Sequence, residues 1–137
     1  MKNILFLMIL CPMISFATPA EDDFGEATGV YIGLCYGINI LKRQSCPSVE
    51  EVNTSSCETE VLRLLPAKYH EGMKYAINSV RPTYLNDLPK DIARGFKKSM
   101  VNMNGDIKSA CISYYTAINT MKYQKYEELK RMAKYLQ

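Results

Sequence analysis

The strongest constraint on the fold of this chain is a set of four cysteines that follows its first 17 residues: Cys35, Cys46, Cys57 and Cys111. Residues 1–17 carry a single lysine, an apolar run and small residues near Ala17, which is typical of a secretory signal peptide. An even number of cysteines in an exported chain of this size predicts two disulfides. We therefore expect cleavage near Ala17, a single helical domain over residues 18–137, and a periplasmic or secreted protein.

Two other interpretations of these features are disfavoured by the sequence. A zinc site is the alternative for the cysteines, but the chain has no Cys-x-x-Cys pair and its only histidine is His70. A retained membrane anchor is the alternative for residues 1–17, but their apolar run is shorter than the about 20 residues that span a bilayer. We expect no metal and no stable membrane insertion after cleavage.

Hydrophobic residues recur at helical spacing along most of the chain, and no β-hairpin signal interrupts them. The spacing predicts helices over residues 21–43, 57–80, 87–103 and 106–135, with a polar loop over 44–56. Because proline lacks an amide hydrogen, we expect the second helix to be kinked or split at Pro66 and to end at Pro82. The predicted fold is all-α, a small disulfide-bonded bundle of about four helices.

The expected helices predict how the cysteines pair. Cys46 and Cys57 bracket the loop, which favours a bridge between them. Cys35 and Cys111 fall on the inner faces of the first and last helices, so a second bridge is expected to clamp these helices together.

Glycine occupies every fourth position of the stretch GEATGVYIGLCYG: Gly25, Gly29, Gly33 and Gly37. Each glycine inside a helix costs about 1 kcal/mol relative to alanine, so a close neighbour must offset the loss. That neighbour is a helix of the same chain, a membrane helix, or a partner protein received in a groove. The uncharged stretch 27–41 is short for a membrane span, which leaves internal packing and partner binding as the main alternatives.

Charge is divided unevenly along the chain. Residues 18–60 hold eight acidic side chains against two basic ones, whereas residues 61–137 hold fourteen basic against six acidic. The last predicted helix concentrates basic residues and tyrosines, and four of them are candidate partner-binding residues: Lys122, Tyr123, Tyr126 and Lys130. Tyrosine is favoured at protein interfaces because its rigid ring buries much area, although a solvated charged face is the simpler alternative. An exported protein rarely meets nucleic acid, so we do not expect nucleic acid as a partner.

The sequence lacks the motifs of common catalytic sites, including HExxH, GxSxG and a glycine-rich phosphate loop. His70, in AKYHEG, is expected to face solvent. Glu58 and Glu60 are two residues apart and so point to different sides of a helix, and Glu58 is expected to form a capping box with Ser55. We therefore expect a protein without catalytic residues or a cofactor.

Several short motifs resemble small periplasmic immunity proteins of type VI secretion systems. The likeness is carried by Cys35-Tyr36-Gly37-Ile38, Cys46-Pro47, Tyr84-Leu85 and the set Pro89, Ile92, Ala93 and Phe96. The resemblance implies a helical, disulfide-bonded and often dimeric protein that blocks a cell-wall amidase delivered by neighbouring cells. The first two cysteines stand closer than in that family and the helix after Asp106 has no counterpart there, so no inhibitory residue is carried over.

The leading hypothesis from the sequence is an exported, non-enzymatic protein-binding protein. In its most concrete form it is an immunity or inhibitor protein that neutralises a secreted effector attacking the cell wall. A periplasmic chaperone or assembly factor is the alternative, and the sequence leaves open whether the chain forms a homodimer.

Overall fold

The computed structural model describes residues 18–137, and the predicted signal peptide lies outside the described residues. Within that range every regular element is helical: α2 (Pro19–Gln44), α3 (Thr54–Leu64), η1 (Ala67–Tyr69), α4 (His70–Asn86), α5 (Leu88–Asn102), α6 (Ile107–Ala133) and η2 (Lys134–Leu136), where η marks a 3₁₀ turn. The predicted all-α bundle is confirmed. The described part of the chain has five α-helices, because the second predicted helix is divided in two.

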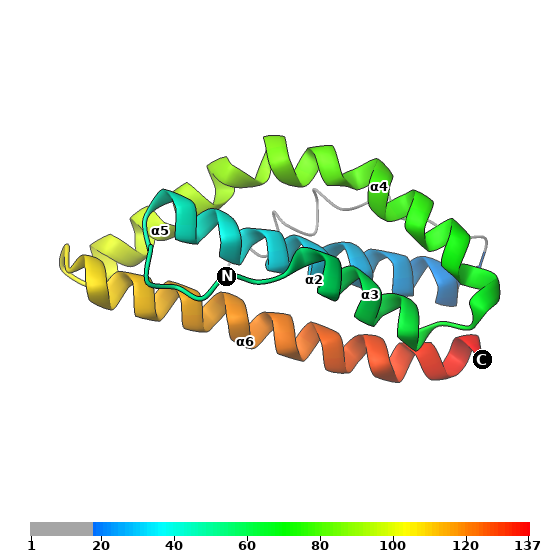
Figure 1. The fold of residues 1–137 in the computed structure, drawn as a ribbon. Helices are drawn as coiled ribbons and strands as arrows, with labels where there is room; N and C mark the ends of the chain where they lie inside the picture. Colours follow the sequence, from blue (N-terminus) through cyan, green and yellow to red (C-terminus); the bar gives the residue numbers. More distant parts are fainter. Residues whose placement is uncertain (1–17) are drawn as a thin grey trace.

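α2 is the central helix, and the other helices pack around it (Figure 1). Between Phe24 and Leu41 only Glu26 and Tyr36 are not buried. In the view of Figure 1, α6 runs below α2 in the opposite direction, and α4 and α5 form an arch above it. A helix that is apolar around its whole circumference belongs at the centre of a bundle, because no side of it is suited to water.

The ends of α2 follow the polar residues that the sequence places there. The hydroxyl of Thr18 accepts a hydrogen bond from the amide of Glu21 at 3.2 Å, which caps the helix. Acidic residues occupy the first turn and basic residues the last turn, where each sign is stabilised by the helix dipole. The helix predicted over residues 21–43 is therefore present and slightly longer.

The break at Pro66 is confirmed. α3 ends at Leu64, and the chain passes through η1 before α4 begins at His70. The ring nitrogen Nε2 of His70 lies 2.9 Å from the carbonyl oxygen of Leu65, the residue that caps the carboxyl end of α3. Carbonyl groups at the end of a helix need partners from outside the helix. His70 is half-buried in this contact, so the expectation that it faces solvent is wrong.

Pro82 does not end the second helix, contrary to the sequence-based expectation. It lies inside α4, which continues to Asn86. Tertiary contacts on both sides of the proline explain why: Val80 and Tyr84 are buried, and the Tyr84 hydroxyl donates a hydrogen bond to the carbonyl oxygen of Gly29 at 2.7 Å. These contacts offset the backbone hydrogen bond that proline cannot make.

The loop between α2 and α3 folds back along α2 and is held by its side chains. The Asn39 amide nitrogen donates to the Val52 carbonyl at 2.7 Å, and the Val52 amide donates to Asn39 Oδ1 at 2.7 Å. The Lys42 ammonium donates to the carbonyl oxygens of Pro47 and Val49 at 2.8 and 2.7 Å. Because its polar groups are paired in this way, the loop has a fixed course against α2.

That course overturns the predicted disulfide pairing. All four cysteines are bridged, but the pairs are Cys35–Cys57 and Cys46–Cys111. Cys46 directly follows α2, at the end where α6 carries Cys111 past it. The loop then returns along α2, so that Cys57 in the first turn of α3 meets Cys35, roughly 14 Å from the end of α2 at 1.5 Å per residue.

The two bridges predict unequal losses of stability. The Cys46–Cys111 bridge spans 65 residues and the Cys35–Cys57 bridge spans 22. In the chain-entropy model, replacing both cysteines of a pair with serine lowers the free energy of unfolding by about 4 kcal/mol for the long loop and about 3 kcal/mol for the short one. Denaturant unfolding of the two double variants measures this order, and non-reducing peptide mapping of the wild type checks the pairing. A Cys35–Cys111 peptide in that map would contradict the fold described here.

Candidate binding groove

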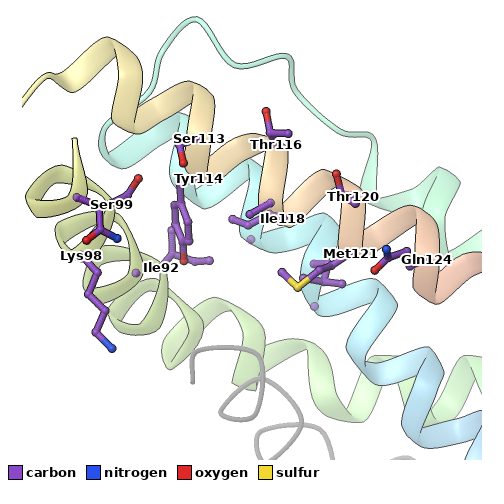
Figure 2. Close-up of a pocket in the computed structure, with 16 residues that line it drawn as sticks. Ile92, Lys98, Ser99, Ser113, Tyr114, Thr116, Ile118, Thr120, Met121 and Gln124 are labelled. Carbon is purple, nitrogen blue, oxygen red and sulfur yellow. The ribbon is translucent and has the colours of Figure 1, made fainter. Parts of the chain in front are cut away.

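A groove of about 600 Å³ lies between α5 and α6, and α2 forms its floor. Figure 2 shows side chains from α5 and α6 around it, including Ile92 and Lys98 of α5 and Tyr114, Ile118 and Met121 of α6. We call this feature the α5–α6 groove. Its volume falls within the range of sites that bind small molecules or side chains of another protein.

The lining of the α5–α6 groove is mostly apolar or weakly polar. Leu34, Ile92, Ile118 and Met121 supply the larger apolar side chains. Small hydroxyl and amide residues complete the wall: Ser99, Asn102, Ser113, Thr116, Thr120 and Gln124. Lys98 is the single charged residue among the described lining residues, and it is exposed. The groove therefore presents an apolar floor, hydrogen-bonding walls and one positive charge.

The glycine stripe of α2 divides between internal packing and this groove. The carbonyl oxygen of Gly29 accepts the Tyr84 hydrogen bond, and Gly25 is buried. Gly37 permits a close approach of α5, because a Cβ at this position would lie 3.1 Å from Cδ1 of Ile92. Gly33 and Gly37 also line the α5–α6 groove. Internal packing thus accounts for Gly25, Gly29 and Gly37, and partner binding at the glycines stays a prediction.

The predicted basic and tyrosine-rich face of α6 is not one continuous free surface. The Tyr126 ring packs on the Tyr31 ring of α2, with centroids 5.5 Å apart. Lys122 is half-buried, and its burial lowers the pKa of its ammonium group. Lys130 pairs with Glu127 at 3.3 Å and also lies over the Tyr126 ring. Among the four candidates, only Tyr123 exposes most of its side chain.

The two glutamates of α3 have structural partners. Glu58 Oε1 accepts from the Arg81 guanidinium at 2.7 Å, and Arg81 Nε donates to the Tyr36 hydroxyl at 3.0 Å, which joins α3, α4 and α2. Glu60 accepts from the Tyr31 hydroxyl at 3.1 Å, and burial together with this carboxylate raises the pKa of Tyr31. The expected capping role of Glu58 is wrong, because Asn53 caps α3.

A buried carboxyl group stands beside the groove. Asp91 on α5 is 4% exposed, and its Oδ2 has no hydrogen-bond partner among the described residues. Burial raises the pKa of Asp91, and Arg94, whose Nη1 lies 3.5 Å from Oδ1, opposes the increase. Burial and the nearby Asp91 charge raise the pKa of Tyr114 to about 12. Tyr114 therefore presents a protonated phenol to the groove at neutral pH.

The described lining residues of the groove do not bring together a nucleophile and a base. The Ser99 hydroxyl donates to the Ala110 carbonyl oxygen at 3.1 Å, and Tyr114 remains protonated. His70, bonded to the end of α3, is not among the lining residues. Within residues 18–137, no group of three His, Cys, Asp or Glu side chains is placed to hold a metal ion.

Sequence reasoning did not find this groove. The sequence feature that could have revealed the groove is a second row of small residues on α6: Ser113, Ala117 and Thr120. These residues line the groove together with Gly95 and Ser99 of α5. Small residues at i, i+4 and i+7 share one face of a helix, but the sequence does not say whether a neighbour fills that face.

Among the described helices, none combines the length and hydropathy needed to cross a membrane. Comparisons with protein-family models, with curated proteins and with solved structures find no match for this chain. The likeness to immunity proteins therefore rests on the short motifs alone.

A pair of glycine substitutions tests the packing of α2. No atom lies within 4 Å of a Cβ added at Gly72 in α4, so Gly72→Ala should stabilise the protein by about 0.5 to 1 kcal/mol through helix propensity. Gly37→Leu should instead destabilise it by about 1 to 3 kcal/mol, because the side chain overlaps Ile92. Denaturant unfolding measures both values. A Gly37→Leu variant as stable as the wild type would show that α2 and α5 are not in close contact.

The buried Asp91 predicts a pH-dependent stability. Its pKa is higher in the folded state than its ordinary value of 3.8, so the folded state binds this proton more tightly. The ionised Asp91 carboxylate thus destabilises the folded state above the raised pKa, and this destabilisation disappears below pH 3.8. Asp91→Asn should raise the free energy of unfolding by about 1 kcal/mol at pH 7 and leave it unchanged near pH 3. Unfolding curves at the two pH values measure the difference, and an equal effect at both would contradict the assignment to this charge.

Proposed function

We propose that the mature chain is an exported, non-enzymatic binding protein that inhibits a secreted effector acting on the cell wall, as an immunity protein does. The observation that carries the proposal is the α5–α6 groove, which offers an apolar floor, hydrogen-bonding walls and one cation without a catalytic group of side chains. Such a surface binds another molecule and does not transform it.

The two disulfides support export. Stable bridges persist in oxidising compartments, and Cys35, Cys46 and Cys57 are buried, which suits a structural role. Together with the signal-peptide pattern of residues 1–17, they favour a protein that works outside the cytoplasm, where effectors attacking the wall are met.

The charge of the surface around the groove supports a protein partner of opposite sign. α5, which forms one wall of the groove, holds four exposed basic residues, Lys90, Arg94, Lys97 and Lys98, and one acidic residue, the buried Asp91. A basic surface steers an acidic partner toward it and speeds association. An inhibitor must capture its target before the target reaches the wall, so fast association suits the proposed role.

Capture from the host tests this function. The tagged mature protein is expected to retrieve one protein at a near-equal ratio from periplasmic extract of its own host. After separation, that protein should cleave purified peptidoglycan, and an equimolar amount of the mature protein should stop the cleavage. The same tag on an unrelated exported protein is the control. A scatter of substoichiometric clients would favour the chaperone alternative, and a retrieved partner that lacks wall activity or stays active would overturn the proposal.

A further inference from the structure

The α5–α6 groove has the length of a short helix. Its wall on α6 runs from Ser113 to Gln124, which spans about 16 Å at 1.5 Å per residue. Its wall on α5 runs from Ile92 to Asn102, about 15 Å. Three turns of an α-helix have the same length at a pitch of 5.4 Å. The two walls and the floor thus surround the position of one further, short helix.

The side chains of the groove are those that admit a helix closely. Gly33 and Gly37 lie on the floor, Gly95 on the α5 wall, and Ala117 between Ser113 and Thr120 on the α6 wall. Small residues let the backbones of packed helices approach, and helices already form the floor and both walls here. Met121, which is half-buried, provides an apolar contact for the buried face of the occupant, and Ile118 lies in the core beside it.

The charge of the groove selects among possible occupants. Lys98 is the sole charged side chain among the lining residues that the structure describes, and the exposed Lys97 stands next to it in the chain. An occupant with a carboxylate that faces Lys98 gains a favourable charge pair, whereas a basic occupant meets repulsion.

A second copy of this chain is a poor occupant. The large exposed hydrophobic residues are scattered over the described helices: Tyr75, Leu85, Val101, Ile107, Ile112, Tyr123 and Tyr135. No described helix carries three of them at i, i+3 or i+4 and i+7 spacing, which an occupant helix requires. Among residues 18–137 no helix of a second copy suits the groove, which favours a helix of a different protein as the occupant.

We propose that the α5–α6 groove binds an amphipathic helix of about three turns from a partner protein, apolar on one face and carrying a carboxylate that meets Lys98. This inference deepens the proposed function, since the helix would belong to the inhibited effector. The groove prediction itself does not require that the partner act on the cell wall.

A selection of peptides tests the inference without knowledge of the partner. A display library of fifteen-residue helical peptides is selected on the immobilised mature protein with both disulfides intact. The enriched peptides are expected to share apolar residues at i, i+3 or i+4 and i+7, together with an acidic residue. They should gain helical circular dichroism on binding. Enriched peptides without this pattern, or a selection that enriches no peptide, would overturn the inference.

Three variants test whether the selected peptides bind in the α5–α6 groove. Ala117→Phe fills the groove at an exposed alanine and should weaken peptide binding by at least about tenfold. Lys98→Glu should weaken it by about tenfold at low salt and less at high salt, because the lost charge pair is screened. Ala93→Phe, at an exposed alanine of α5 outside the groove lining, is the matched control and should bind like the wild type. Thermal unfolding confirms that each variant is folded. Peptides that bind the Ala117→Phe variant and the wild type with equal affinity would show that they do not bind in the α5–α6 groove.

The same variants separate the inference from the proposed function. A captured wall hydrolase that Ala117→Phe inhibits as strongly as the wild type does would refute the helix site and retain the function. A captured partner without wall activity that fails to bind Ala117→Phe would refute the function and retain the helix site.

Discussion

The burial of α2 on nearly all sides is the constraint on which the rest of the structure depends. A helix with apolar residues around its whole circumference must be surrounded, and one or two neighbours do not suffice. The chain meets this requirement by wrapping α3, α4, α5 and α6 around α2. The polar exceptions on α2 are consistent with it, because Asn39 binds the returning loop through both of its amide atoms. The disulfides then fix two of the surrounding segments to α2 or to its end.

The groove arises from the same constraint. Four α-helices pack around α2, and α5 and α6 leave a groove that is lined at its base by Gly33 and Gly37, both of them buried. At Gly37 the missing side chain is used by Ile92 of α5, and at Gly29 the backbone carbonyl is used by Tyr84 of α4. Gly33 borders the groove instead. One stripe therefore serves close packing along part of its length and borders the α5–α6 groove along another part.

Local features of the sequence were predicted well, and features that depend on distant partners were not. The ends of α2 and the break at Pro66 follow from short-range chemistry that the residues carry with them, and the bridging of all four cysteines follows from their even number in an exported chain. The continuation of α4 through Pro82 depends on Tyr84 reaching Gly29, 55 residues away in the chain. The role of Glu58 likewise depends on Arg81, which the fold brings to it from another helix.

By itself, the sequence determined an all-helical, disulfide-bonded domain, because periodicity, capping residues and proline act over a few residues. It also determined that α2 needs close neighbours, since four glycines in one helix are costly without them. Only the tertiary structure decided which cysteines pair, because pairing depends on the path that Asn39 and Lys42 impose on the loop after α2. Only the tertiary structure decided which glycines border a groove, because a groove is the space left between helices whose relative placement no single segment encodes.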